Sequence, residues 1–577
     1  MPLDADTSRR IRRLALQNAI QHAGTPRPGP VVARLLATQP ELRRSAGDVE
    51  SAVRAAIDEV ARLAPEAVAA ALADLGGPEA DRPARVQSDT GEFPELPGAR
   101  PGEVVLRMAP FPSGTLHIGN ARMIFVNEYY RRKYGGKLLL VFDDTIGSEE
   151  KRVDLEVFDL IQRDLELCGS RPDAIYYKSD RIARFYPWAR RVIDAGGAYV
   201  CTCPAETLRD NRARGIECSH RSQTPAETVA EWERMLGGEY PPGGAVLRLR
   251  TSLAEPDPAF RDRVLFRISD LEHPRVGRRY RVWPLLEFSW AVDDIELGVT
   301  HVLRGKDLVM EDRMQETIWN LLGVTGPKFL HWGLLRVREA KISKSKSYAE
   351  VKSGQYDGWA DPRTWSIASL DRRGISPEAI RRFTLSFGLS LADIEVPAET
   401  LYAENRALID ATTPRRAYVP EPMLLEIAGY PADLARVELA NHPDHPEMGR
   451  RSVAAGPNVY LSRRDLETKL GQEVRLKDLV NIRLPAQLPS DPSAAVPVQF
   501  TSRENQRIPR LQWVGATEAV PVELLDPEGR WHAGLGEGAL ALSAPRQVVQ
   551  LERVGFARLE PGPVPASGPV RLCFGHP

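Results

Sequence analysis

This sequence of 577 residues has few cysteines, no long apolar runs and almost no net charge. No uninterrupted apolar stretch approaches the roughly 18–20 residues that a membrane-spanning helix needs, so no membrane partner is expected. Five cysteines are too few for a disulfide scaffold. The first residues lack a basic region followed by an apolar stretch, which argues against secretion and makes the cytoplasm the expected location.

The charge is balanced overall but not locally. The formal net charge of −1 gives no global attraction to nucleic acid. Residues 450–510, however, hold eleven Lys and Arg against six Asp and Glu. Such an excess fits contacts with nucleic-acid phosphates, although taken alone it is more typical of an ordinary solvated face.

The length predicts about three to five domains of roughly 100–200 residues each. Residues 1–75 show helical periodicity and predict a small helical domain. Residues 76–102 are rich in Pro, Gly and charge, which indicates a linker. From 103 to 345 an apolar run, a glycine-containing turn, a helical segment over 116–133 and a second apolar run over 138–142 follow one another. This order is typical of a doubly wound, Rossmann-type α/β nucleotide-binding domain.

The remaining third of the chain has two patterns. A helical segment over 346–415 includes clear 3.6-residue periodicity from about 371 to 408. From 416 to 577 short alternating runs, separated by Gly, Pro and Asp, predict antiparallel β structure in a sandwich or barrel. The expected fold is therefore a multidomain α/β protein with an all-β carboxyl-terminal region.

Residues 107–120 (RMAPFPSGTLHIGN) place a glycine-containing turn between a strand and a helix. Backbone N–H groups at such a helix start favour an anion, for example a nucleotide phosphate. Gly119 allows a base or ribose to approach the backbone closely, and His117 can donate to a phosphate oxygen as charge develops. A purely structural capping role for His117 is an equal alternative.

Residues 341–347 (KISKSKS) form a basic segment with small hydroxyl side chains. Lysines in a loop of this kind can fold over a triphosphate and neutralise it, especially in the transition state. Taken alone, the segment is more typical of a solvated surface loop.

Together, the two segments resemble the HIGH and KMSKS signatures of class I aminoacyl-tRNA synthetases. Their first positions, His117 and Lys341, are 224 residues apart. The surrounding text is similar to that of the glutamyl/glutaminyl group, and specifically of the archaeal-type glutamyl-tRNA synthetases. The segments that carry this likeness, in order, are 15–19, 40–43, 107–114, 142–145, 299–307, 359–363, 441–446 and 551–556.

The resemblance implies an enzyme, a glutamate-tRNA ligase. Such enzymes use Mg²⁺ and ATP to convert glutamate into glutamyl-adenylate, and then transfer the acyl group to the 3′ end of tRNA(Glu), with tRNA(Gln) as a further candidate. The implied architecture is a catalytic domain with an acceptor-binding insertion (about 195–285), a helical stem-contact junction (346–415) and β-barrel anticodon-binding domains (416–577). A monomer is expected.

The resemblance also implies site residues. His117 and Lys344 are the expected catalytic residues. The residues expected to bind ATP are Gly119, Asn120, Lys341, Ser343, Lys344 and Ser345. For the amino acid, Arg107 matches an arginine that pairs with a substrate carboxylate, Asp143 an acidic residue that receives the α-amino group, and Leu286 a position lining the pocket. Arg304 favours glutamate over glutamine because a guanidinium makes two parallel bonds to a carboxylate; the alternative is a structural ion pair with Asp307 or a neighbour.

Three of the five cysteines cluster with a histidine. Cys201, Cys203, Cys218 and His220 supply the soft tetrahedral donor set that suits structural zinc. The family often carries zinc in the insertion that holds the tRNA acceptor end. A remnant that folds without metal is the alternative.

Four positions depart from the family pattern: Asn120, Val141, Ile146 and Leu286. Leu286 stands where a tyrosine is usual, and the loss of a phenol removes a hydrogen-bond donor next to a carboxylate. Two further hypotheses therefore stay open. One is a paralogue with altered amino acid specificity or a role in a specialised pathway, and the other is a tRNA-binding protein that has lost catalysis.

Overall fold

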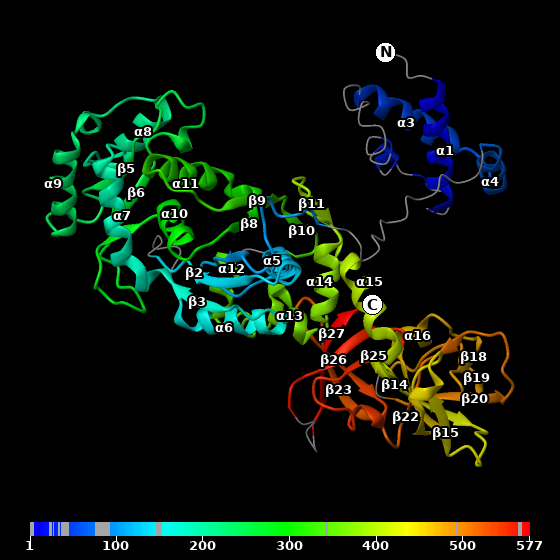
Figure 1. The fold of residues 1–577 in the computed structure, drawn as a ribbon. Helices are drawn as coiled ribbons and strands as arrows, with labels where there is room; N and C mark the ends of the chain where they lie inside the picture. The colour runs from blue at the N-terminus through cyan, green and yellow to red at the C-terminus, as the bar shows by residue number, and fades with distance from the viewer. Residues whose placement is uncertain are drawn as a thin grey trace. The chain divides into compact units, whose positions relative to one another are not determined.

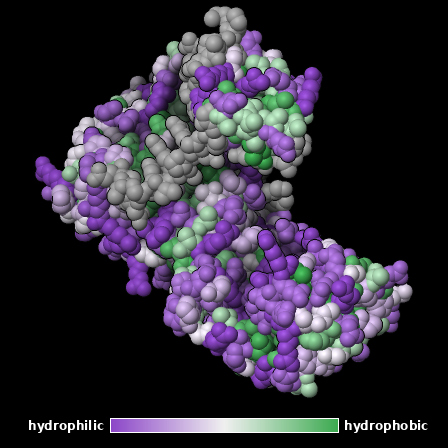
Figure 2. All heavy atoms as spheres, turned by 90° about the vertical axis from the view of Figure 1, so that its right-hand side faces the viewer, coloured by the Kyte–Doolittle hydropathy of each residue, from purple (hydrophilic) through white to green (hydrophobic). Residues whose placement is uncertain are grey.

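The computed structural model describes residues 5–21, 26, 28–29, 31–32, 35, 46–75, 93–145, 153–340, 344–491, 494–562 and 568–577. The chain divides into two compact units, Met1–Gly91 and Glu92–Pro577. Ile146, Lys341, Ser343 and most of the expected linker lie outside the described residues. No helix within the described ranges is long and apolar enough to cross a membrane, and the face drawn in Figure 2 is mostly hydrophilic.

The first unit consists of helices that pack their apolar faces together. They are α1 (Ala5–Gln21), α3 (Ala46–Val60) and α4 (Pro65–Asp74). Leu14, Val53 and Val68, one from each helix, are buried in its core. The helical periodicity read from the sequence therefore corresponds to the buried faces of real helices.

The second unit begins with a five-stranded sheet of order β3-β2-β1-β8-β9, in which every neighbouring pair is parallel (Figure 1). Its strands are β1 (Val105–Met108), β2 (Lys137–Phe142), β3 (Ala174–Tyr177), β8 (His301–Gly305) and β9 (Lys328–Trp332). Helices α5 (Ala121–Tyr134) and α6 (Leu155–Leu167) follow β1 and β2. The predicted Rossmann-type domain is thereby confirmed.

Helix α5 begins five residues later than its periodicity predicts. A 3₁₀ turn, η2 (Ile118–Asn120), precedes it because the side chains of His117 and Asn120 cap that turn. These polar caps offer the backbone an alternative to the α-helix that apolar spacing alone does not reveal. The helix ends at Gly135, whose φ of 59° is the left-handed conformation that glycine adopts without strain.

Between β3 and β8 the chain builds a second, antiparallel sheet of order β4-β5-β6-β7. Its strands are β4 (Ala198–Cys201), β5 (Val246–Leu249), β6 (Val264–Ile268) and β7 (Val282–Pro284). The helices around it are α7 (Ile182–Asp194), α8 (Ala205–Arg214), α9 (Pro225–Leu236), α10 (Leu286–Glu296) and α11 (Val309–Leu322). Trp232, Trp283 and Phe288 fill the core between them.

The expected helical junction, 346–415, contains four α-helices and one strand that pairs with a strand from just before it. These elements are β10 (Leu335–Val337), α12 (Lys344–Lys352), α13 (Ile367–Arg372), α14 (Pro377–Leu385), β11 (Ile394–Val396) and α15 (Ala398–Ile409). The periodic stretch from 371 to 408 is broken because Gly374 and Gly388 adopt positive φ angles of 79° and 58°.

The described part of the carboxyl-terminal region is β-rich, as predicted, with one short helix, α16 (Arg463–Glu467), and comprises two seven-stranded sheets and one two-stranded ribbon. The predicted antiparallel pairing was wrong for four of its strand pairs, which are parallel. The strands of the first sheet, in spatial order, are β12 (Arg415–Arg416), β25 (Val548–Leu551), β26 (Gly555–Leu559), β27 (Val570–His576), β23 (Val520–Leu525), β24 (Trp531–Gly536) and β13 (Tyr418–Pro420). Those of the second are β21 (Arg510–Leu511), β18 (Glu473–Leu476), β19 (Asn481–Arg483), β20 (Val496–Ser502), β14 (Pro422–Ala428), β17 (Asn458–Ser462) and β22 (Val514–Gly515). The ribbon pairs β15 (Arg436–Ala440) with β16 (Arg450–Ala454).

A substitution at Gly136, between α5 and β2, tests how closely the chain packs there against the backbone of Val104. A Cβ added at Gly136 would lie 2.4 Å from the backbone oxygen of Val104. We expect Gly136→Ala to destabilise the second unit by about 1–3 kcal/mol, because the strand must shift. Gly456→Ala is the matched control, since its Cβ would meet nothing within 4 Å. Thermal unfolding of both variants measures the difference, and equal midpoints would contradict the expectation.

Candidate active site

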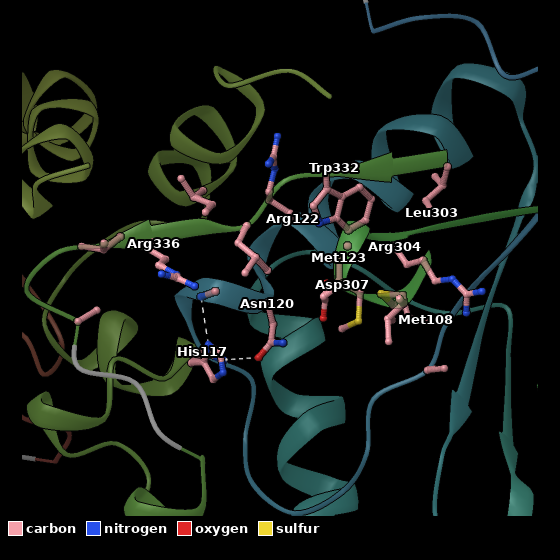
Figure 3. Close-up of a pocket in the computed structure, with 18 of the residues that line it drawn as sticks. Met108, His117, Asn120, Arg122, Met123, Leu303, Arg304, Asp307, Trp332 and Arg336 are labelled. Atoms are coloured by element: carbon pink, nitrogen blue, oxygen red, sulfur yellow. Dashed lines mark hydrogen bonds between the residues drawn. The ribbon is translucent and has the colours of Figure 1, made fainter. Parts of the chain in front are cut away.

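A pocket of about 640 Å³ opens at the carboxyl edge of the parallel sheet. Strand β1 pairs with β2 on one side and with β8 on the other, so the chain reverses its strand order at β1. In open parallel sheets ligands bind at this reversal, outside the carboxyl ends of the strands. The lining comes from β1, η2, β8, β9 and β10, with His117 and Arg304 toward opposite ends of it (Figure 3).

His117 and Gly119 form a tightly fitted pair at the start of η2. The Nδ1 atom of His117 accepts the Gly119 backbone N–H at 3.1 Å, so a neutral imidazole carries its proton on Nε2. A Cβ at position 119 would lie 2.9 Å from the imidazole Cε1, which is why a glycine is needed there. The backbone N–H of His117 donates to Asn120 Oδ1 at 3.2 Å. The capping role considered from the sequence is therefore present, and both side chains also line the pocket.

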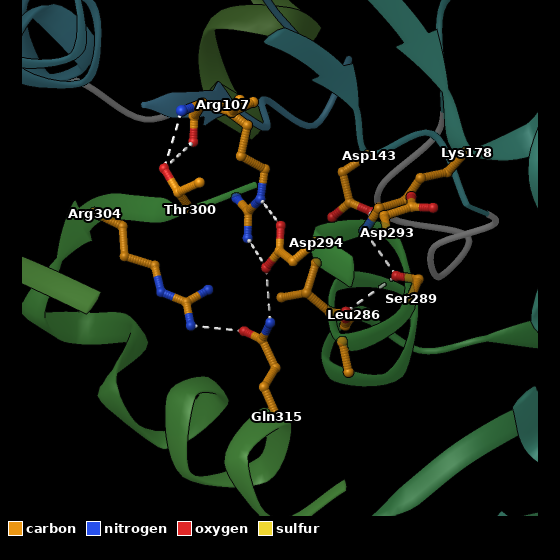
Figure 4. A network of polar contacts seen from close by, with 12 residues as sticks. Arg107, Asp143, Lys178, Leu286, Ser289, Asp293, Asp294, Thr300, Arg304 and Gln315 are labelled. Atoms are coloured by element: carbon orange, nitrogen blue, oxygen red, sulfur yellow. Dashed lines mark hydrogen bonds and ion pairs between the residues drawn. The ribbon is translucent and has the colours of Figure 1, made fainter. Parts of the chain in front are cut away.

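Arg107 and Arg304 are joined through a buried polar network (Figure 4). Arg107, on β1, makes two bonds to the carboxylate of Asp294, at 2.5 and 3.0 Å. Gln315 donates to the same carboxylate at 2.9 Å and accepts from Arg304 Nη2 at 2.7 Å. The carboxylate of Asp312 pairs with Arg304 as well. The expected ion pair of Arg304 thus exists, but its partner is Asp312 and not Asp307.

Arg304 keeps two donors for a ligand. Its Nε and Nη1 atoms are buried and, among the described residues, have no hydrogen-bond partner. Burial lowers the pKa of Arg304, and the nearby Arg107 guanidinium lowers it further, against the Asp312 carboxylate. A buried guanidinium with unmatched donors gains most from an anion that can approach both of them.

Asp143 is already paired with a cation in this structure. It follows β2, and Lys178 follows the neighbouring β3, in a register that sets Phe142 opposite Tyr177. The Lys178 Nζ lies 2.8 Å from Asp143 Oδ1 and donates to Ser289 Oγ at 2.7 Å. Burial lowers the pKa of Lys178, whereas the Asp143 and Asp293 carboxylates raise it.

The indole of Trp290 stands among three cations. Its ring centroid lies 4.9 Å from Arg107 Cζ, 4.9 Å from Arg304 Cζ and 5.1 Å from Lys178 Nζ. The Trp290 Nε1 atom is buried without a hydrogen-bond partner among the described residues. An indole in contact with several cations is held by its negative ring face.

Two of the four departures have clear structural settings. Val141 is fully buried and packs with Leu139, Val299 and Val302, so it is a core position. Leu286 is the first residue of α10 and lies near the Arg107 network in Figure 4. Helix α12 contains Lys344 and Ser345, whose side chains are outside the description.

The four residues of the cysteine cluster do converge. Their donor atoms lie within 4.8 Å of one another, with Cys201 Sγ 3.9 Å from Cys218 Sγ and Cys203 Sγ 3.5 Å from His220 Nδ1. Zn–S bonds of about 2.3 Å give tetrahedral S···S edges of about 3.8 Å, so the spacing fits zinc. Thr202 Oγ1 lies 2.8 Å from His220 Nε2, which fixes the ring and leaves Nδ1 toward the cysteines.

Lys178, Trp290, Asp294 and Gln315 were not identified from the sequence. Only Lys178 has a weak sequence signal: it is a polar residue that directly follows a short apolar run, just as Asp143 directly follows the apolar run of β2. Asp294 and Gln315 lie on helices α10 and α11, and nothing local in the sequence points them toward Arg107.

Family models account for nearly all of the second unit. Residues 103–410 match the catalytic domain of tRNA synthetases class I (E and Q). Residues 413–494 and 510–560 match two models of the anti-codon binding domain of the same class. The second unit therefore has the catalytic and anticodon-binding domains of a class I tRNA synthetase.

Curated relatives extend the likeness to the first unit. Glutamate–tRNA ligases of Methanothermobacter thermautotrophicus and Pyrococcus horikoshii are 39% identical to this chain, each over 95% of it and 96% of their own length. The Methanothermobacter marburgensis protein of that name is 38% identical over 95% of this chain and 97% of itself. The chain belongs to the glutamyl and glutaminyl (E and Q) family of class I tRNA synthetases. A crystal structure of the glutamate-tRNA synthetase from Elizabethkingia anophelis aligns with 54% of this chain and 72% of its own at 20% identity, with a TM-score of 0.38.

The Arg107–Asp294 pair gives a direct test of the network. Its side chains are 4% and 0% exposed. We expect Asp294→Asn to destabilise the second unit by about 3–5 kcal/mol, because it leaves a buried guanidinium without its counter-charge. The double variant Arg107→Met/Asp294→Leu removes both charges and should lose much less stability. Urea unfolding of the three proteins measures this, and a double variant as unstable as Asp294→Asn would contradict it.

Proposed function

We propose that this protein is a glutamate–tRNA ligase, which activates glutamate with ATP and transfers it to the 3′ end of tRNA(Glu). The observation that carries the proposal is the identity of 36–39% with glutamate–tRNA ligases over 95% or more of the chain. We further propose that it works as a cytoplasmic monomer and that tRNA(Gln) is a second candidate acceptor.

In this proposal Arg304 binds the side-chain carboxylate of glutamate. Its Nε and Nη1 donors are buried at the pocket and have no other partner in the described part of the chain. Glutamine would leave part of the guanidinium charge unmatched, so the arginine selects against the amide. Arg107 lies beside Arg304 at the same pocket, and Asp294 holds it in place. Asp143 is the proposed acceptor of the α-ammonium group.

The other end of the pocket is proposed to hold ATP. The imidazole of His117 is proposed to reach the phosphates from the η2 turn, while Gly119 and Asn120 shape the contact. The backbone N–H groups of η2, which the sequence suggested as anion donors, already bond to Trp365 and His117. The α-carboxylate of glutamate is proposed to attack the α-phosphorus of ATP and displace pyrophosphate, whose charge Mg²⁺ and the lysine segment would neutralise. Lys341, Ser343, Lys344 and Ser345 make up the proposed phosphate-binding part of that segment.

The tRNA is proposed to run along the second unit. The insertion that contains β4–β7 would take the acceptor end, the helices of 346–415 the stem, and the two seven-stranded sheets the anticodon. The Lys and Arg excess of residues 450–510 supports the last assignment, because phosphate contacts need local positive charge.

Zinc is the proposed ligand of Cys201, Cys203, Cys218 and His220. The donor spacing and the contact of Thr202 with His220 support a closed, structural tetrahedral site. The metal would fix the turn after β4 against η4 (Ser219–Ser222) within the insertion.

Lys344 is the sharpest test of the ligase activity. We expect Lys344→Ala to lower the rate of glutamate charging by about 10²-fold or more, because it removes a cation from the developing charge. Lys328→Ala, at an exposed position of β9, is the control and should charge normally. Aminoacylation of total tRNA with each of the twenty amino acids provides the measurement. Binding of tRNA without charging by any amino acid would instead favour a binding protein that has lost catalysis.

Metal analysis tests the zinc proposal. We expect about one zinc per purified chain by plasma mass spectrometry, and its loss in Cys203→Ser. Cys168→Ala is the control, because Cys168 is a buried cysteine outside the cluster and should leave the zinc in place. Removal of zinc by a chelator should lower the midpoint of thermal unfolding of the wild type and not that of Cys203→Ser. A zinc-free wild type would refute the site.

A second candidate function is ligation of an amino acid other than glutamate. The pairing of Asp143 with Lys178 favours it, since the group proposed to receive the α-ammonium already has a cation. Leu286 in place of a phenol favours it as well. The panel of twenty amino acids separates the two functions by the identity of the acid that is charged.

A further inference from the structure

Lys178 occupies a complete cation site. Its side chain is 0% exposed, it makes an ion pair with Asp143, and it donates to Ser289 Oγ. Trp290 presents its ring to the same ammonium at 5.1 Å. In Figure 4 Asp143, Lys178 and Ser289 lie together on one side of Asp294, with Arg304 and Gln315 on the other.

The surroundings of Lys178 are those that an α-ammonium group requires. A lysine ammonium and an α-ammonium both offer three N–H donors and one positive charge. Each is satisfied in a buried site by a carboxylate together with neutral acceptors, as Asp143 and Ser289 provide here. A second cation brought to Asp143 would have to share its carboxylate and would meet the charge of Lys178 at short range.

Lys178 is not available for release into water. The neighbouring cations are committed elsewhere: Arg107 pairs with Asp294, and Arg181 with Asp293 and Glu296. Moving the Lys178 ammonium away would leave Asp143 as a buried carboxylate without a counter-charge until a ligand arrived. A ligand cation that reaches the carboxyl ends of β2 and β3 would therefore compete with Lys178 for the Asp143 carboxylate.

We propose that Lys178 is a specificity-determining residue that competes with the substrate's α-ammonium group for Asp143. The site thereby disfavours acids with a free α-ammonium and tolerates acids that carry a neutral group there, such as a hydroxyl. This inference rests on the proposed function, because it takes Asp143 as part of the site that binds the acyl substrate.

The test compares glutamate with 2-hydroxyglutarate, which has a hydroxyl in place of the ammonium. Wild type, Lys178→Gln and Lys178→Met are titrated with both acids by calorimetry, and ATP–pyrophosphate exchange is measured with tRNA present. We expect both variants to bind glutamate at least about tenfold more tightly than the wild type, because the ligand ammonium then supplies the only cation at Asp143. Binding of 2-hydroxyglutarate should change little, and KM for glutamate should fall more than kcat changes.

The matched control is Lys178→Met/Asp143→Asn, which removes both charges. It should fold, since no buried charge is left unpaired, and it should lose the tighter binding of glutamate. A purely structural role for Lys178 would weaken both acids alike, and that result, or equal affinities of wild type and variants for glutamate, would overturn the proposal. If neither the wild type nor any variant catalyses pyrophosphate exchange, the ligase activity is refuted. The competition for Asp143 is still tested, because calorimetry measures the binding of glutamate directly.

Discussion

The parallel pairing of β1 with β2 on one side and with β8 on the other decides where the polar side chains of the site lie. All three strands end at the same edge of the sheet, so residues far apart in the sequence meet there. Arg107 and Arg304 come from β1 and β8, and Asp143 follows β2. The register of β2 with β3 adds Lys178 beside Asp143. The polar side chains at this edge of the sheet therefore follow from strand order before any ligand is considered.

At this edge three buried cations each have a carboxylate partner. Arg107 pairs with Asp294, Lys178 with Asp143, and Arg304 with Asp312. Unpaired charges would be costly so far from water, and the pairing holds the long side chains in one arrangement. What distinguishes Arg304 is that two of its donors stay unmatched within the described residues. An incoming carboxylate can therefore bind to a guanidinium that is already oriented by Asp312 and Gln315, which lowers the cost of ordering it.

The sequence predicted the elements that depend on local pattern and missed the contacts that depend on tertiary packing. The apolar runs at β1 and β2 are visible in the chain because these strands are buried on both faces. The carboxyl-terminal runs are visible because burial alternates along strands such as β14. The predicted start of α5 was wrong because the caps formed by the side chains of His117 and Asn120 outweigh the apolar spacing. Asp294 and Trp290 lie on helix α10, which belongs to the long segment between β3 and β8. Their contact with Arg107 depends on how this segment folds back against β1, and no local sequence pattern encodes that packing.

Sequence similarity to the family along the whole chain does not by itself determine the chemistry at the carboxyl edge of the parallel sheet. Identity of 36–39% over at least 95% of the chain extends across both units and the β domains. In the function proposed here, recognition of the acyl substrate depends instead on a few side chains around Trp290, and Lys178 changes what Asp143 can bind. Because Lys178 is held by the side chains of Asp143 and Ser289, we infer that the scaffold proposed to present tRNA and ATP sites can stay intact while the acid it selects shifts.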